Sequence, residues 1–146
     1  MSDFRTLNDT VLASPQITVE DVAIAKAQGV SLIVNNRPEG ESADQTPGDA
    51  IEAAARAAGI EYLAIPITHA GFSLPQVDAL AQALGRADGK VLAYCRSGTR
   101  STLLWALARA KAGDAPEAIA AAAAEAGYDV FPVRPTMDML AGQASG

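Results

Sequence analysis

Short apolar runs alternate with longer helix-like stretches along the chain, and a glycine marks several of the changes from one to the other. The apolar runs cover residues 30–34, 60–65, 90–94 and 128–131, and the glycines before them are Gly29, Gly59, Gly89 and Gly127. Glycine just past a helix end readily adopts the left-handed conformation that closes the helix. The pattern therefore predicts four helix-to-strand units.

Helix starts are also visible in the sequence. Thr18 with Asp21, and Asp114 with Glu117, have the spacing of side chains that cap a helix N-terminus. The alanine-rich tract at 118–126 carries glutamates and is typical of a surface helix instead of a linker. These signals place helices between the apolar runs.

Alternating helices and short apolar strands indicate a single α/β domain over residues 1–146, with a central, mostly parallel sheet and helices on both faces. Active sites in such sheets lie beyond the carboxyl ends of the strands. Cys95 follows one of these ends. The long polar loop at 35–49 follows another, and its segment at 37–41 is placed to reach the same edge. A solvated connection explains that loop equally well.

The composition is that of a folded, acidic protein. The chain has 146 residues, 49% of them hydrophobic, and a formal net charge of −6. This charge argues against binding nucleic acid or an anionic membrane through bulk electrostatics. One cysteine excludes an internal disulfide, and one cysteine with one histidine excludes a dedicated zinc cluster, so no metal or other cofactor is expected. A reducing, cytoplasmic location is expected, because neither a basic leader nor a membrane-length apolar run is present.

The only cysteine lies where an apolar run gives way to a helix-like run. The residues after Cys95 are Arg96, Ser97, Gly98, Thr99, Arg100 and Ser101. A chain turning there aims backbone N–H groups into a small bowl at a helix N-terminus, which favours an anion. Gly98 suits the bend, and Arg100 can meet an oxyanion with two parallel hydrogen bonds. A thiol in this bowl is expected to ionise easily, and the thiolate is the form that attacks electrophiles.

Each feature of this segment alone has an ordinary explanation. A lone cysteine is usually a small buried hydrophobe, and a stretch rich in arginine, serine and glycine is usually a solvated turn. Their combination at one strand-to-helix junction favours a thiolate site. We therefore predict Cys95 and Arg100 as catalytic residues, and Arg96, Ser97, Gly98, Thr99 and Ser101 as substrate-binding or oxyanion-binding residues.

The cysteine, the short glycine-containing loop and the Arg-Ser pair resemble the cysteine-dependent phosphatases and the rhodanese sulfurtransferases. With the segments at 35–41 and 62–66, the chain is similar over roughly residues 4–140 to a bacterial phosphatase-like domain family, which is named after beta-lactamase hydrolase-like proteins. This resemblance implies the sheet-and-helix fold of dual-specificity phosphatases. It also implies Cys95 as nucleophile, Arg100 as oxyanion clamp and no metal.

Two features depart from the phosphatase pattern. Four residues separate Cys95 from Arg100, as in rhodaneses, whereas cysteine phosphatases have five. A narrower cradle suits one terminal sulfur better than a phosphoryl group, which needs room for its equatorial oxygens and two in-line atoms. The loop at 67–73, where such phosphatases carry a general-acid aspartate, contains no carboxylate, and Asp78 lies farther on. This absence weakens the phosphatase interpretation, because proton donation typically contributes a factor of about 10² to 10⁴.

His69 is the residue of that loop that can replace the missing acid, since imidazole titrates near neutrality. A loop histidine hydrogen-bonded to backbone is the ordinary alternative. His69 is therefore a candidate general acid, and its role is left open.

We expect a thiolate enzyme, and the favoured mechanism is sulfur transfer. Cys95 would attack the outer sulfur of thiosulfate or a small persulfide, hold it as a persulfide and pass it to a nucleophilic acceptor. Arg96 and Arg100 would hold the anionic donor. The first alternative is hydrolysis of phosphate monoesters through a phosphocysteine, and the second is a non-catalytic module that binds an oxyanion. The expected partner is a small anionic substrate, and the sequence identifies no protein partner.

Overall fold

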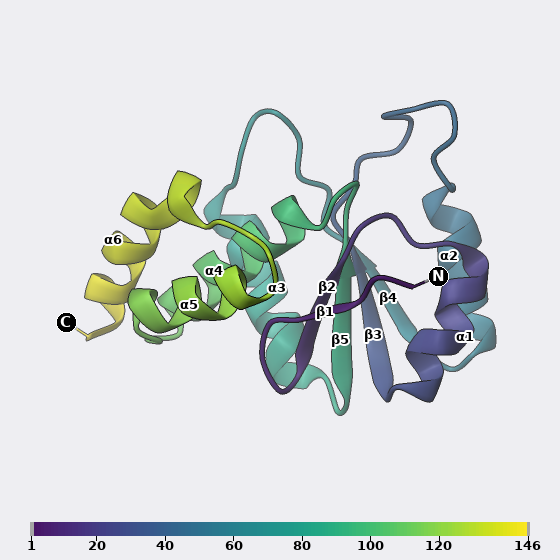
Figure 1. Ribbon diagram of the computed structural model, residues 1–146, viewed down its shortest axis with the longest axis horizontal. Helices are drawn as coiled ribbons and strands as arrows, with labels where there is room; N and C mark the ends of the chain where they lie inside the picture. The colour runs from purple at the N-terminus through teal and green to yellow at the C-terminus, as the bar shows by residue number, and fades with distance from the viewer. Residues whose placement is uncertain (1, 146) are drawn as a thin grey trace.

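The computed structural model describes residues 2–145 and is built around a five-stranded sheet (Figure 1). The strands are β1 (Arg5–Thr6), β2 (Val11–Ser14), β3 (Val30–Asn35), β4 (Glu61–Ala64) and β5 (Lys90–Tyr94). They lie in the order β1-β2-β5-β3-β4, and all pairs are parallel except β1 with β2. The predicted mostly parallel sheet is confirmed.

Helices cover both faces of this sheet, as predicted. On one face lie α1 (Val19–Ala27) and α2 (Gly48–Ala57), seen to the right of the sheet in Figure 1. On the other lie α3 (Leu74–Arg86), α4 (Thr99–Lys111), α5 (Pro116–Glu125) and α6 (Arg134–Ser145), with the short 3-10 turn η1 (Phe131–Val133) before α6. No helix within residues 2–145 combines the length and apolar character needed to cross a membrane.

The strands β2, β3, β4 and β5 contribute to two separate cores, because successive side chains point to opposite faces of a sheet. In β5, Val91 and Ala93 join the larger core beneath α3 to α6, whereas Leu92 and Tyr94 join the smaller core beneath α1 and α2. The helix α4 is central to the larger core, and all of its residues from 101 to 108 are buried. Packing on all sides therefore fixes the position of the helix that follows Cys95.

The glycine pattern is confirmed at three of its four positions. The φ angles of Gly29, Gly59 and Gly127 are +90°, +77° and +93°, in the left-handed region predicted for residues that end a helix. Gly89 differs, because it has no positive φ and α3 already ends at Arg86. An added Cβ at Gly89 would lie 2.9 Å from the carbonyl oxygen of Gly29. A close approach of two chain segments, and not a helix cap, therefore explains this glycine.

One of the two predicted helix caps is confirmed. Thr18 and Asp21 form a reciprocal capping box at the start of α1. The prediction for Asp114 is wrong, because α5 begins one residue later than the sequence suggests, with Ala115 as its N-cap. The Asp114 carboxylate instead accepts hydrogen bonds from Arg109 at 2.7 and 3.0 Å. Because Asp114 forms this ion pair with Arg109, its side chain does not cap the helix.

The predicted helix over the alanine-rich tract is confirmed as α5, but the predicted strand at 128–131 is wrong. After α5 the chain runs through Tyr128 without strand pairing and enters η1. Pro132 in η1 has no N–H group to donate to a sheet. The buried Tyr128 instead packs beside the loop that follows β5. A short apolar run that is buried by tertiary contacts has the same pattern as a strand.

Candidate active site

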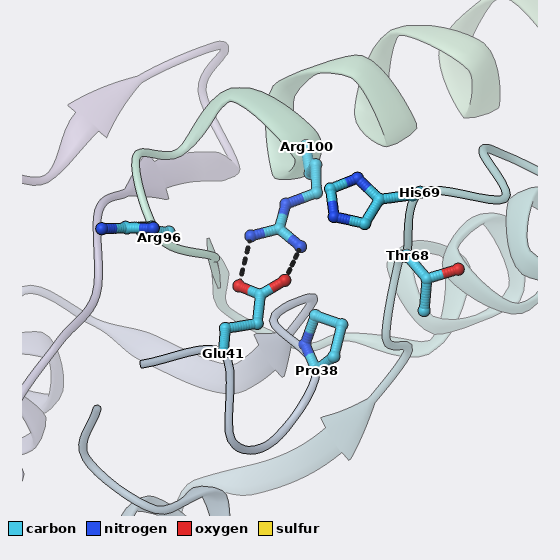
Figure 2. Close-up of a pocket in the computed structure, with 6 residues that line it drawn as sticks. All are labelled: Pro38, Glu41, Thr68, His69, Arg96 and Arg100. Atoms are coloured by element: carbon cyan, nitrogen blue, oxygen red, sulfur yellow. Dashed lines mark hydrogen bonds and ion pairs between the residues drawn. The ribbon is translucent and has the colours of Figure 1, made fainter. Parts of the chain in front are cut away.

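Three loops meet at the edge of the sheet where β3, β4 and β5 end, at the top of the sheet in Figure 1. They surround an open pocket of about 570 Å³, which is lined by Pro38, Glu41, Thr68, His69, Arg96 and Arg100 (Figure 2). The loop at 35–49 therefore reaches the edge of the sheet that carries Cys95. This decides between the two alternatives that the sequence leaves open for that loop.

Cys95 lies directly after β5 and is fully buried. Its backbone N–H donates to the carbonyl of Ser14 in the neighbouring strand at 3.3 Å, which fixes the point where the chain leaves the sheet. Its Sγ atom accepts the backbone N–H of Gly98 at 3.1 Å. The loop is thus folded around the sulfur, with a donor already aimed at the atom predicted to react.

Gly98 turns the chain from this loop into α4. Its φ is +94°, in the left-handed region, and it is the N-cap of the helix. An added Cβ would overlap the Tyr128 hydroxyl and lie 2.8 Å from the Cζ atom of that ring. The same hydroxyl donates to the carbonyl of Ser97 at 3.1 Å and supports the loop from behind. Both the backbone angle and the packing therefore require glycine here.

The N-terminus of α4 lies where the predicted anion cradle needs free backbone donors. The first N–H groups of a helix have no intrahelical acceptors and carry partial positive charge. In α4, the bond from the Thr102 N–H to the Gly98 carbonyl, at 3.0 Å, closes the first turn. The N–H groups of Arg100 and Ser101 precede that bond, so an anion beside Cys95 would meet them without breaking the helix.

The hydroxyl groups of the loop do not all face this cradle. The Ser97 hydroxyl donates to Thr99 Oγ1 at 2.9 Å, and both residues are exposed. Ser101 is fully buried and its hydroxyl donates to Asn36 Oδ1 at 2.7 Å, so the predicted role of Ser101 in oxyanion binding stays open only for its backbone. Helical phase turns this side chain inward, so only its backbone N–H is left for an anion.

Asn36 is a structural residue of the site that the sequence analysis missed. It is buried, and its Nδ2 donates to the carbonyl of Ile65 at 2.9 Å while its Oδ1 accepts from Ser101. It therefore ties together the loops after β3 and β4 and the first turn of α4. Its sequence signal is a polar side chain directly after a buried strand.

A carboxylate from another loop holds Arg100. The Nη1 and Nη2 atoms of Arg100 donate to Glu41 Oε2 and Oε1 at 2.7 and 2.8 Å, as Figure 2 shows. Nη1 also donates to the carbonyl of Ile67 at 2.8 Å. Arg37 reaches the same carboxylate, with Nε 3.0 Å from Oε1. The sequence analysis placed this loop near the site but did not identify Glu41 as the partner of Arg100.

These ion pairs fix the charge of Glu41. Hydrogen bonds from Arg100, assisted by Arg37, lower the pKa of Glu41 to about 2. The contact with Glu41 also raises the pKa of Arg100, and nearby Cys95 adds to that increase. At pH 7, a carboxyl of this pKa is protonated in about one molecule in 10⁵. Glu41 therefore cannot serve as a general acid near neutrality.

The other candidates for chemistry lie on opposite sides of the Arg100–Glu41 pair. Figure 2 shows Arg96 on one side and His69 on the other, and both are exposed. His69 thus lines the site, while its catalytic role stays a prediction. Asp78 lies in α3 and pairs with Lys111 of α4. Among the described residues that line the pocket, Glu41 is the only carboxylate.

Sequence comparisons identify relatives of this chain. The profile of the family described as beta-lactamase hydrolase-like protein, phosphatase-like domain, matches residues 3–112. A beta-lactamase hydrolase-like protein of Xylella fastidiosa is 34% identical over 101 residues, which cover 69% of this chain and 23% of that protein. The chain spans about a quarter of the length of the curated relatives it matches.

Solved structures share the fold. A candidate phosphatase from Neisseria meningitidis matches with a TM-score of 0.83 and 31% identity, over 94% of this chain and 98% of that one. A kinase-associated phosphatase, crystallised with its catalytic-site cysteine replaced by serine, matches with a TM-score of 0.72 and 14% identity. The match covers 100% of this chain and 96% of that one. These similarities confirm a dual-specificity-phosphatase-like fold and support a cysteine-dependent, phosphatase-like enzyme; they favour the phosphatase interpretation over sulfur transfer. The matched sequence and the shared fold together show that the chain belongs to the phosphatase-like domain family of the beta-lactamase hydrolase-like proteins.

Proposed function

We propose that this domain transfers sulfur through a persulfide on Cys95. The observation that carries the proposal is the charge state of the pocket. The carboxylate that lines it, Glu41, is held ionised by Arg100 and cannot donate a proton near neutrality. An alkoxide leaving group needs such a proton, whereas sulfite is a stable anion that leaves without one. Unless His69 supplies the proton, the site therefore suits a reaction whose leaving group needs no acid.

Sulfur transfer through Cys95 needs only thiosulfate and a thiolate acceptor, and no external oxidant or reductant. The Cys95 thiolate attacks the outer sulfur of thiosulfate, the sulfur–sulfur bond breaks, and its electron pair leaves with sulfite. A thiolate acceptor then attacks the outer sulfur of the Cys95 persulfide and regenerates the Cys95 thiolate. Arg100 and the N–H groups at the start of α4 stabilise the anionic donor and the persulfide, since donors aimed at developing charge lower the barrier. The four-residue spacing between Cys95 and Arg100 supports a cradle for a single terminal sulfur.

Phosphate monoester hydrolysis is the second candidate, and the comparisons favour it. The Neisseria meningitidis structure is described as that of a candidate phosphatase, and it is 31% identical to this chain. In this mechanism Cys95 would attack phosphorus, the leaving oxygen would take a proton, and water would hydrolyse the phosphocysteine. His69 lines the pocket and is the available proton donor.

Intact-mass spectrometry separates the two candidates. After incubation with thiosulfate or with a small persulfide, we expect the chain to gain the mass of one sulfur, and Cys95→Ser to gain none. Incubation with an aryl phosphate should give little phosphate release. Efficient hydrolysis of aryl phosphate by a chain that never gains sulfur, and transfers none to a thiol, would establish the second candidate instead.

His69→Ala tests the proton donor of the second candidate. If phosphate esters are hydrolysed, we expect the substitution to slow alkyl phosphates by about 10²-fold or more and to leave activated aryl phosphates nearly unchanged. The reason is that only a poor leaving group needs the proton. The measurement is the rate of phosphate release from both substrates. Equal losses would assign His69 a structural role, and no loss would make it an ordinary loop residue.

A further inference from the structure

We infer that Glu41 is a positioning residue that presents one edge of Arg100 to the bound anion. The inference rests on the proposed role of Arg100 as an anion clamp, but it does not depend on whether sulfur or phosphate is transferred. It differs from the simplest interpretation of the ion pair, in which a carboxylate occupies the anion site and competes with the substrate.

The contacts of the guanidinium distinguish these interpretations. A guanidinium offers two edges with parallel donors, one formed by Nη1 and Nη2 and the other by Nε and Nη2. Glu41 takes the first edge, and the second N–H of Nη1 donates to the carbonyl of Ile67. Among the described residues, Arg100 Nε donates no hydrogen bond to an oxygen acceptor, and the guanidinium interacts on its remaining side with the nearby Cys95 sulfur. The edge formed by Nε and Nη2 is therefore left for a planar or tetrahedral oxyanion.

The free edge lies on the side of the cradle. Nη1 is on the side of Ile67, which is followed by the pocket residues Thr68 and His69. Arg96 lies on the opposite side of the ion pair in Figure 2. The edge formed by Nε and Nη2 therefore faces Arg96 and the loop that follows Cys95. The contribution of Cys95 to the raised pKa of Arg100 agrees with this orientation.

Glu41 is itself held by a buried arginine. The side chain of Arg37 is only 4% exposed, and its Nε donates to Glu41 Oε1. Its other two nitrogens donate to Gln16 Oε1 and Ser42 Oγ, both at 3.1 Å. Nitrogens in a fixed fork geometry thus orient the carboxylate from one side, and the carboxylate orients Arg100 from the other. A carboxylate that only occupied the anion site, and had to leave it in each turnover, would not need to be held by a buried arginine.

Whether Glu41→Gln weakens or tightens anion binding distinguishes a carboxylate that positions Arg100 from one that competes with the anion. Removing a negative charge from an anion-binding pocket should, by Coulomb's law alone, tighten anion binding. Loss of a competing carboxylate would tighten it further. If Glu41 instead holds Arg100 in place, Glu41→Gln should weaken anion binding despite the removal of that charge. A weaker affinity is therefore an outcome that simple electrostatics does not produce.

The test uses the Cys95→Ser chain, which binds thiosulfate without reacting, and follows its backbone amide signals by NMR during titration. We expect Glu41→Gln to raise the dissociation constant for thiosulfate about tenfold or more, because misplaced donors lose most of their effect. Glu41→Asp, which keeps the charge but is shorter, should recover part of the affinity. The matched control is Glu52→Gln, which removes a carboxylate paired with Arg56 on the outer surface of α2 and should leave the affinity unchanged.

A double-mutant cycle completes the test. In the Arg100→Ala background, Glu41→Gln should no longer weaken binding, because the positioning effect acts through Arg100 and only the loss of the negative charge, which favours the anion, is left. The effect should also be constant from about pH 5 to about pH 8, because a group of pKa about 2 stays ionised there. Tighter or unchanged binding in Glu41→Gln would overturn the inference. If binding weakens as expected but the reactive chain never gains sulfur, the proposed function fails while the role of Glu41 stands.

Discussion

Replacing Arg100 with alanine is expected to slow the reaction of Cys95 with thiosulfate by about 10²- to 10³-fold, the usual loss when one oxyanion donor is removed. Arg100 is the residue at which the cradle, the Glu41 loop and the Ile67 carbonyl meet. Its removal takes away a charge and two parallel donors at once. The measurement is the rate of persulfide formation, followed by intact mass in samples quenched at successive times. Circular dichroism verifies the fold of the variant.

Arg100→Lys separates charge from geometry. Lysine restores the positive charge but not the two parallel donors, so it should recover only a small part of the lost rate. It also cannot reproduce the paired bonds to Glu41 at 2.7 and 2.8 Å. A lysine variant with the full wild-type rate would show that only charge is used, and an alanine variant with that rate would show that Arg100 does not act on the donor.

The reactive segment could be predicted because its chemistry is local in sequence. Cys95, Gly98 and Arg100 lie close together where the chain passes from the end of β5 into the first turn of α4, so the residue types alone indicate a strand end, a left-handed bend and a helix start. The direction of the Ser101 side chain was not available from that information. It depends on the phase of α4 and on Asn36, which enters from the loop after β3.

Glu41 could not be assigned to Arg100 from sequence, because the two residues are 59 positions apart. Their contact arises from the strand order, in which β3 lies directly beside β5 and brings the two following loops together. The available signal was the Arg37 and Glu41 pair in a polar loop after a buried strand. That signal places a charged loop near an edge of the sheet, but it does not name the partner.

The strand wrongly predicted at 128–131 also reflects contacts between residues that are far apart in the sequence. Its apolar residues are buried by long-range packing, and Tyr128 supports the loop through the Ser97 carbonyl, 31 residues away. An apolar run of four residues carries too little periodicity to separate a strand from a buried irregular segment. The segment therefore matters to the site as a brace behind the loop, and Gly98 is where that brace can be tested.

Gly98→Ala is expected to destabilise the chain by about 2–4 kcal/mol, the sum of positive-φ strain and overpacking. The residue has a φ of +94°, and its new Cβ would overlap the Tyr128 hydroxyl. The matched control is Gly29→Ala, since Gly29 has a φ of +90° and open space around the added Cβ. The control should cost only about 1 kcal/mol and should leave the reaction of Cys95 unchanged.

The difference between the two variants measures the contact with Tyr128, because the backbone strain is nearly the same in both. Urea unfolding gives the two free energies, and thiosulfate reactivity reports on the loop. In Gly98→Ala we expect reactivity to fall even under conditions where the chain is folded, because the shifted loop moves the N–H that Cys95 Sγ accepts at 3.1 Å. Equal losses of stability in both variants would show that Tyr128 does not brace the loop. A folded Gly98→Ala chain with full reactivity would show that this N–H is not needed for the chemistry at Cys95.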